Sequence, residues 1–112
     1  MIKPNVYIRF LDFVAVLDSK CTLKTLDPTE NLLLNIVMRD DQARRSIFVG
    51  DLIGLRLLGS QAMLHKRVMN LRSMGYIKLV IQDDARKKRV MPTLQAYKRF
   101  EAFSRCMKRA AE

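Results

Sequence analysis

The stretch from Ser60 to Leu94 constrains the fold most strongly, because its pattern changes from helix to strand at one glycine. Before Gly75, apolar residues recur at spacings of four and three, which places them on one face of a helix. After it, Tyr76–Gln82 is rich in β-branched and aromatic residues, and Arg89–Met91 can pair with it across a basic tip at Asp83–Lys88. A helix followed by a β-hairpin, with cations on both, is typical of a winged-helix nucleic-acid reader.

The helix before Gly75 is predicted to be the second helix of a helix-turn-helix. Ser60 can cap it, and Gly59 provides the turn from a shorter helix over Leu52–Leu58. The residues predicted to face the core are Leu64, Val68 and Leu71. The residues predicted on the opposite face are Gln61, Ala62, His65, Lys66, Met69, Asn70 and Arg72.

Two further helices and a short strand are predicted before the helix-turn-helix. Residues 4–20 are apolar around most of the circumference, so this helix needs burial on more than one side, which a second subunit could supply. Asp27 can cap the next helix, with Glu30 completing a capping box, and this helix should end near Arg39. Ile47–Val49 can add a third strand to the hairpin. The residues that the second helix should direct inward are Leu32, Leu33, Ile36 and Val37.

The last helix should begin after Thr93, which can cap it, while Pro92 ends the preceding strand. The expected fold is mainly α with a small β-wing: a winged helix-turn-helix over 27–94, flanked by dimerisation helices at 4–20 and 93–111. At 112 residues the chain is expected to be a single domain that dimerisation would help. The predicted dimer-interface residues are Tyr7, Phe10, Leu11, Val14, Phe100, Phe103 and Met107.

The charge of the chain is unevenly distributed. Lysine and arginine total 21 against 11 acidic residues, for a net charge of +10. Residues 1–59 hold 8 basic and 7 acidic side chains, whereas residues 60–112 hold 13 and 4. Clustered cations attract polyanions by releasing condensed counterions, so nucleic acid is the leading predicted partner. Two alternatives stay open: an assembly module that binds an acidic protein, and a module that binds RNA or a replication complex.

Sequence patterns give little support to an enzyme, a metal site or a cofactor. Cys21 and Cys106 lie far apart without a CxxC spacing, and the only histidine is His65. Neither a glycine-rich phosphate loop nor a nucleophile elbow is present. The chain begins without a cleavable signal and contains no apolar run of about 20 residues, so a cytoplasmic protein without a membrane span is expected.

Three segments resemble the MarR family of winged-helix transcription regulators, over roughly residues 27–100. The segment VGDLIGLRLLGSQAMLHKRVMNLRSMGYI is similar to the helix-turn-helix of that family. DDARKKRV resembles its wing, whose hallmark is an Asp-x-Arg step, here at residues 84–86. Met91-Pro92-Thr93 stands where the family has a Leu-Thr that opens its next helix. The chain departs from the family at Arg67, where a core aliphatic residue is usual, at Pro92, and at Ala96.

The resemblance implies a bacterial, nucleoid-associated, homodimeric transcription regulator that binds double-stranded DNA at specific sequences. A helix fits the major groove, and the candidates to contact base edges there are Ser60, Gln61, Ala62, His65 and Lys66. The predicted wing contacts are Asp84, Arg86, Lys87, Lys88 and Arg89. By the resemblance, Arg86 enters the minor groove and Asp84 orients the arginines of the wing. The candidate phosphate contacts are Arg56, Arg72 and Lys78. A small-molecule effector stays an open alternative, although no residue pattern indicates one.

Overall fold

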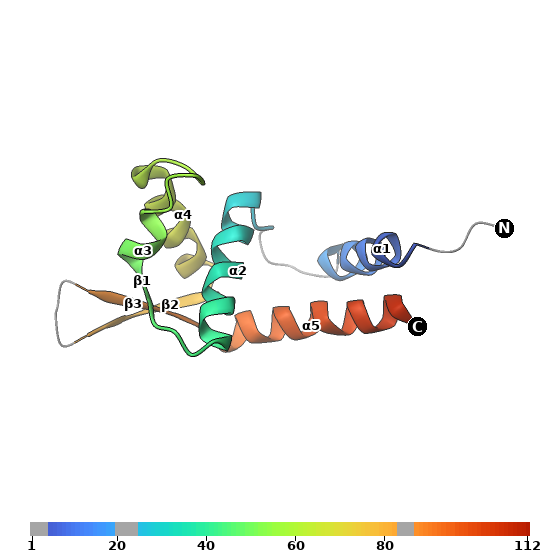
Figure 1. Ribbon diagram of the computed structural model, residues 1–112. Helices are drawn as coiled ribbons and strands as arrows, with labels where there is room; N and C mark the ends of the chain where they lie inside the picture. Colours follow the sequence, from blue (N-terminus) through green and yellow to red (C-terminus); the bar gives the residue numbers. More distant parts are fainter. Residues whose placement is uncertain (1–4, 20–24, 83–86) are drawn as a thin grey trace. The chain divides into compact units, whose positions relative to one another are not determined.

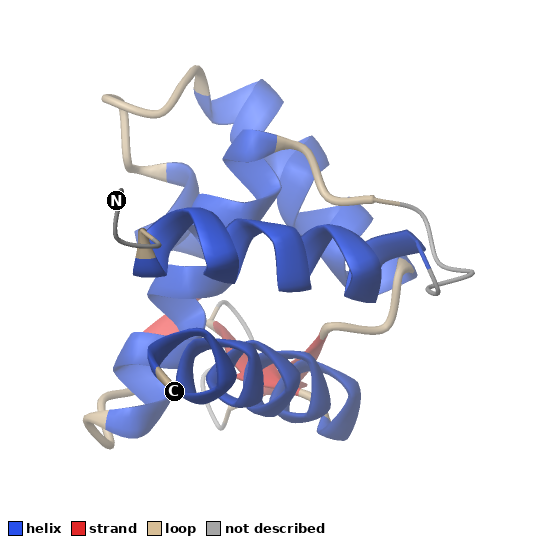
Figure 2. Ribbon diagram, turned by 90° about the vertical axis from the view of Figure 1, so that its right-hand side faces the viewer, coloured by secondary structure: helices blue, strands red, loops and turns tan. Residues whose placement is uncertain are grey.

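The computed structural model describes residues 5–19, 25–82 and 87–112, and Figure 1 shows the helices and strands in these ranges. The chain separates into two compact units, one formed by Leu26–Ala96 and the other by Met1–Thr25 with Tyr97–Glu112. Figure 2 shows that helices dominate and that the strands gather in one small sheet. The predicted class, mainly α with a small β-wing, is confirmed.

Helix α2 (Pro28–Gln42) begins the larger unit at the predicted capping box. The Asp27 carboxylate accepts a hydrogen bond from the Glu30 backbone N–H at 2.7 Å, and the Glu30 carboxylate accepts one from the Asp27 N–H at 3.0 Å. Two backbone donors that would otherwise lack partners are satisfied in this way. The sequence therefore determines where α2 starts.

The end of α2 and one of its inward residues differ from the prediction. No glycine or proline directly follows Arg39 to stop the helix, so it continues to Gln42, and Arg44 then adopts a left-handed φ of 58°. Leu32 is 47% exposed, whereas Leu34 is 1% exposed and lies with Leu33 on the inner face. The apolar run is broader than the buried face of the helix, so periodicity alone selected the wrong leucine.

The sheet has three antiparallel strands in the order β1-β3-β2. Strand β1 (Ile47–Phe48) pairs with β3 (Lys88–Pro92), which pairs along its whole length with β2 (Ile77–Ile81). The predicted third strand is thus present, although it is shorter than expected. Pro92 ends β3 beyond the residues that β1 reaches, where a missing backbone donor is tolerated.

The helix predicted over Leu52–Leu58 lies earlier in the chain, as α3 (Val49–Ile53). The Asp51 carboxylate accepts a hydrogen bond from the Phe48 N–H at 2.9 Å, which starts this helix directly after β1. Gly54 ends it, and the chain then makes successive turns up to residue 59. The prediction was wrong because the run of leucines after Gly54 suggested a helix that the glycine interrupts.

Helix α4 (Gln61–Ser73) ends in the way that the sequence predicted. Gly75 has a φ of 82°, the left-handed conformation that glycine adopts at little cost. The Gly75 N–H donates to the Arg72 carbonyl, and the Tyr76 N–H donates to the Leu71 carbonyl, both at 3.0 Å. These two bonds are the Schellman arrangement that closes a helix. The chain can therefore turn from α4 into β2 within a few residues.

Thr93 joins the end of β3 to the start of α5 (Leu94–Ala111). Its hydroxyl accepts from the Ala96 N–H at 3.4 Å, as the predicted cap, and donates to the Gly75 carbonyl at 2.5 Å. Its backbone N–H donates to the Tyr76 carbonyl at 3.1 Å. One residue thus ties the end of α4, the hairpin and the start of α5 together.

The core of the larger unit is formed mainly by α2, α3 and α4. The predicted stripe of α4 is confirmed, because its three members are fully buried. The largest fully buried side chains are Leu33, Leu34, Leu52, Leu64, Leu71, Val37 and Val68.

The smaller unit contains α1 (Val6–Ser19) beside α5, and the two helices run in opposite directions. A guanidinium nitrogen of Arg9 donates to the main-chain oxygen of Glu112 at 2.9 Å, near one end of the pair. Arg99 lies 4.0 Å from Asp18 near the other end. None of the residues of α1 is buried, although most of them are apolar. The described contacts therefore leave much of α1 uncovered.

Gly75→Ala is expected to lower the free energy of unfolding by about 1–2 kcal/mol, because an L-residue is strained at this φ. An added Cβ would also lie 2.8 Å from Oε1 of Gln95. Urea denaturation followed by circular dichroism measures the change. The matched control is Gly50→Ala, whose Cβ meets nothing within 4 Å. It should stabilise the protein by about 0.4–1 kcal/mol. Equal effects of the two substitutions would contradict this account.

Candidate nucleic-acid interface

The solvent-exposed face of α4 carries side chains that are either uncharged or basic. Among the predicted base-contact residues, Gln61, Ala62, His65 and Lys66 are all exposed. The segment from Ser60 to Gln82 contains no aspartate or glutamate. No acidic side chain on this helix would therefore repel a polyanion that approached it.

The start of α4 is fixed by Ser60, whose hydroxyl oxygen accepts from the Met63 N–H at 3.2 Å. Gly59 precedes it, and a Cβ at this position would lie 2.0 Å from the terminal carbon of Met63. Ser60 is exposed as well as capping, so its O–H can still donate to a ligand. The turn and the cap together fix the N-terminal end of α4, which in helix-turn-helix proteins meets base edges.

The basic hairpin is only partly described. Asp84 and Arg86, the two wing residues that the resemblance singles out, lie outside the described residues. Lys87 and Lys88 are exposed, and Lys88 opens β3 rather than belonging to the tip. Arg89 is less exposed, and it pairs with residues of both β1 and β2. Because neighbours in a strand alternate, Lys88 and Arg89 lie on opposite faces of the sheet.

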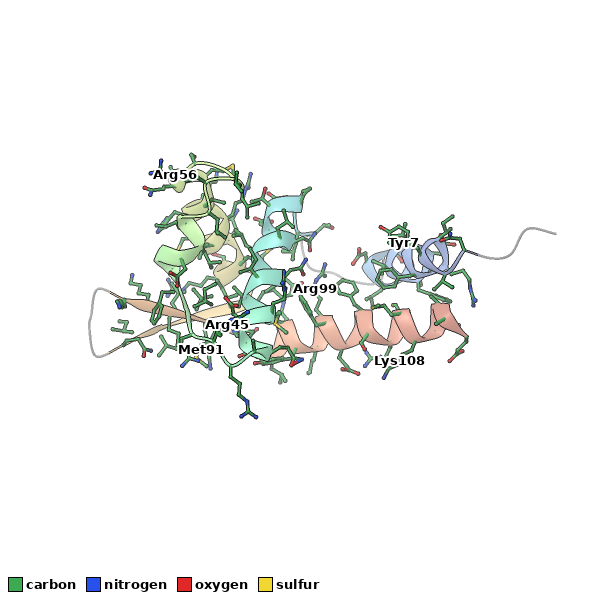
Figure 3. All side chains as sticks on the ribbon, in the orientation of Figure 1. Tyr7, Arg45, Arg56, Met91, Arg99 and Lys108 are labelled. Atoms are coloured by element: carbon green, nitrogen blue, oxygen red, sulfur yellow. The ribbon has the colours of Figure 1, made fainter. Side chains whose placement is uncertain are left out.

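The three candidate phosphate contacts come from three different elements and are all exposed. Arg56 projects from the connection between α3 and α4 (Figure 3). Arg72 lies eleven residues after Gln61 in α4, about three turns along the same face. Lys78 lies in β2, which forms an edge of the sheet.

Ion pairs within the described ranges leave these cations available. The pairs found there join Arg45 to Asp40, Arg67 to Asp27, Arg99 to Asp18, and Arg105 to Glu101. None of the exposed cations of α4 and the hairpin belongs to this set of pairs. Lys87 instead lies over the ring of Phe48, with 5.7 Å between Nζ and the ring centroid. That cation–π contact places the lysine beside β1 and does not neutralise its charge.

Two residues of α4 that sequence reasoning did not place correctly lie against α2. Asn70 was predicted on the outer face, but its amide donates to the Glu30 carboxylate at 3.0 Å. Arg67, noted only as a departure from the MarR family, forms an ion pair with Asp27 at 3.1 Å. The spacings match, because Asp27 and Glu30 are three residues apart in α2 and its cap, and Arg67 and Asn70 are three residues apart in α4. That match was the available signal for the contact.

The predicted dimer-interface residues all lie in the smaller unit. Tyr7, Leu11 and Met107 are 66%, 44% and 60% exposed, which leaves large apolar side chains in contact with water. The other four predicted residues are half-buried: Phe10, Val14, Phe100 and Phe103. Between α1 and α5 runs an open groove of about 340 Å³, lined by apolar residues together with Arg105, Cys106 and Arg109. Packing of the two helices against each other is thus loose.

The described residues hold neither a metal-binding cluster nor a membrane-spanning helix. Within them, no group of three or more histidine, cysteine, aspartate or glutamate side chains could hold a metal ion. Nor does any helix in the described ranges have the length and apolar character that crossing a membrane requires.

The architecture is that of a winged helix-turn-helix flanked by an N-terminal and a C-terminal helix. A solved structure of this kind is S. aureus MepR bound to ethidium bromide, a regulator of the MarR family, with a TM-score of 0.64 to this chain. The alignment covers 96% of this chain and 77% of that one, at 17% sequence identity. No protein-family model and no curated protein matches the sequence. The expected resemblance to the MarR family is therefore confirmed at the level of the fold.

Proposed function

We propose that this protein is a transcription regulator that binds specific sequences of double-stranded DNA as a homodimer. The observation that carries the proposal is the winged helix-turn-helix whose exposed cations on α4 and the hairpin form no ion pair within the described residues. Its net charge and its similarity in fold to a MarR-family regulator support the same conclusion. Winged helices of this type use one helix and one hairpin as separate contacts.

In this proposal α4 enters the major groove and the hairpin contacts the minor groove. Gln61 can make two hydrogen bonds to adenine, and Lys66 can reach guanine or a phosphate. Ala62 can contact a thymine methyl group. The minor-groove role of Arg86 rests on the Asp-x-Arg step of the sequence, because a narrow groove concentrates negative potential around an inserted arginine.

Selection of bound sequences from a random duplex pool tests the proposed function directly. The expected product is an inverted repeat whose half-sites are centred about one helical turn apart, because a two-fold symmetric dimer presents two equivalent helices. Failure to bind any duplex at low salt would contradict the proposal. Preferential binding of RNA or of an acidic protein in competition would favour the two alternative classes.

Arg86→Ala should weaken duplex binding and flatten its dependence on salt. A cation bound in the minor groove displaces condensed counterions as a phosphate contact does, so its loss lowers the magnitude of the log–log salt slope by up to about 0.9 for B-DNA. Fluorescence anisotropy titrations between low and physiological salt give the slope. Lys98→Ala is the matched control, because it removes one exposed cation from α5, outside the predicted contact set. Identical slopes for wild type and Arg86→Ala would remove Arg86 from the contacts.

The wild-type protein is expected to sediment as a dimer at micromolar concentration, and Leu11→Glu should shift it to the monomer. The reason is that a carboxylate placed in an apolar interface loses its hydration. Analytical ultracentrifugation distinguishes the two states. Leu57→Glu serves as the control, because Leu57 is fully exposed in the larger unit and belongs to no predicted interface. A wild-type monomer would contradict the homodimer.

A further inference from the structure

A polar cluster of four side chains connects α4 to the start of α2, on the side of α4 that packs against the core. Nε of Arg67 is shielded from solvent and lies 3.1 Å from Oδ2 of Asp27, as an ion pair that is not a hydrogen bond. Nδ2 of Asn70 donates to Oε2 of Glu30 at 3.0 Å, and Glu30 is only 5% exposed. The cluster therefore joins two helices through one buried carboxylate and one partly exposed ion pair, in which the Arg67 and Asp27 side chains are 32% and 33% exposed.

Each carboxylate of the cluster contacts both helices, using one oxygen for α2 and the other for α4. Oδ1 of Asp27 and Oε1 of Glu30 accept the backbone N–H groups that form the cap of α2. Their second oxygens, Oδ2 and Oε2, face Arg67 and Asn70 of α4. A rotation or slide of α4 would consequently disturb the groups that start α2.

The apolar contacts of α4 do not define its orientation as closely. Leu64, Val68 and Leu71 are completely buried, but hydrophobic burial has no preferred direction. The hydrogen bond from Asn70 to Glu30 operates only over a narrow range of distance and angle, and the attraction between Arg67 and Asp27 weakens as their distance grows. A buried polar pair often adds little net stability over an apolar pair of the same size, and its best-attested role is to set the register between elements.

We propose that Arg67 and Asn70 are positioning residues, which hold α4 in the orientation that reading base edges requires. This inference rests on the proposed DNA-binding function. Hydrogen bonds to base edges need accurate placement of the helix, whereas attraction to phosphates needs mainly proximity. Loss of the cluster therefore lowers affinity for the preferred sequence and leaves affinity for random duplex nearly unchanged. In the MarR family an aliphatic residue usually stands at the position of Arg67, so this chain uses an ion pair there instead.

The test compares two substitutions that change the charge in opposite directions. Arg67→Met removes a positive charge, and Asp27→Asn removes the negative charge that faces it while keeping an effective helix cap. In both variants, the ratio of affinity for the selected sequence to affinity for random duplex should fall about tenfold. A loss of this size corresponds to the discrimination that one good base contact provides. The double variant should be no worse than either single one, because both remove the same interaction. Fluorescence anisotropy, well below the melting temperature of each variant, gives both affinities.

Arg72→Met is the matched control, because it removes the same charge from an exposed position of the same helix. It should weaken both kinds of binding by similar factors and preserve their ratio. Residual dipolar couplings, measured without DNA, give the orientation of α4 relative to α2, which should change in Arg67→Met. Unchanged couplings, or a ratio within about twofold of wild type for Arg67→Met and Asp27→Asn, would overturn the inference. A wild-type protein without any sequence preference would overturn the proposed function itself.

Discussion

The junction around Gly75 is the constraint on which the rest of the larger unit depends. The left-handed glycine ends α4, Thr93 binds the carbonyl of that glycine, and Gln95 donates to the Met74 carbonyl at 3.0 Å. The end of α4, both strands of the hairpin and the first turn of α5 therefore meet within a few residues. Because α4 and the hairpin share this junction, the two predicted DNA contacts are held in a fixed relation to each other.

The parts of this fold that follow from local chemistry could be predicted from the sequence. The capping box at Asp27, the cap at Ser60 and the stop at Gly75 each depend on a few neighbouring residues, and all three are confirmed. The extent of α3 and the choice between Leu32 and Leu34 depend on packing, and both predictions were wrong. Periodicity identifies a hydrophobic face only to within one residue, whereas the core selects the side chain that fits.

The residues of the candidate site likewise separate into those that local sequence could place and those that depend on contacts between distant segments. Exposure of Gln61, Ala62, His65 and Lys66 follows from the helical stripe, so sequence alone could place them on the outer face. The contacts of Arg67 and Asn70 with Asp27 and Glu30 join residues forty positions apart, and a single sequence offers only the matching spacing as a hint. Roles for Asp84 and Arg86 stay predictions from the resemblance. Whether the outer face meets base edges depends on a partner, which no intramolecular contact encodes.

The short length of β1 has a mechanical consequence for the hairpin. Among the described residues, strand β1 pairs only with Val90 and Arg89, so the pair formed by Ile81 and Lys88 lies where the sheet has two strands. Two-stranded ribbons twist more strongly than wider sheets and have little stability of their own. In the proposed function, DNA whose minor groove is too wide or too narrow for the hairpin would have to deform to accept it, which costs binding free energy. Under the proposed function, that cost would add selectivity at base pairs that no side chain touches.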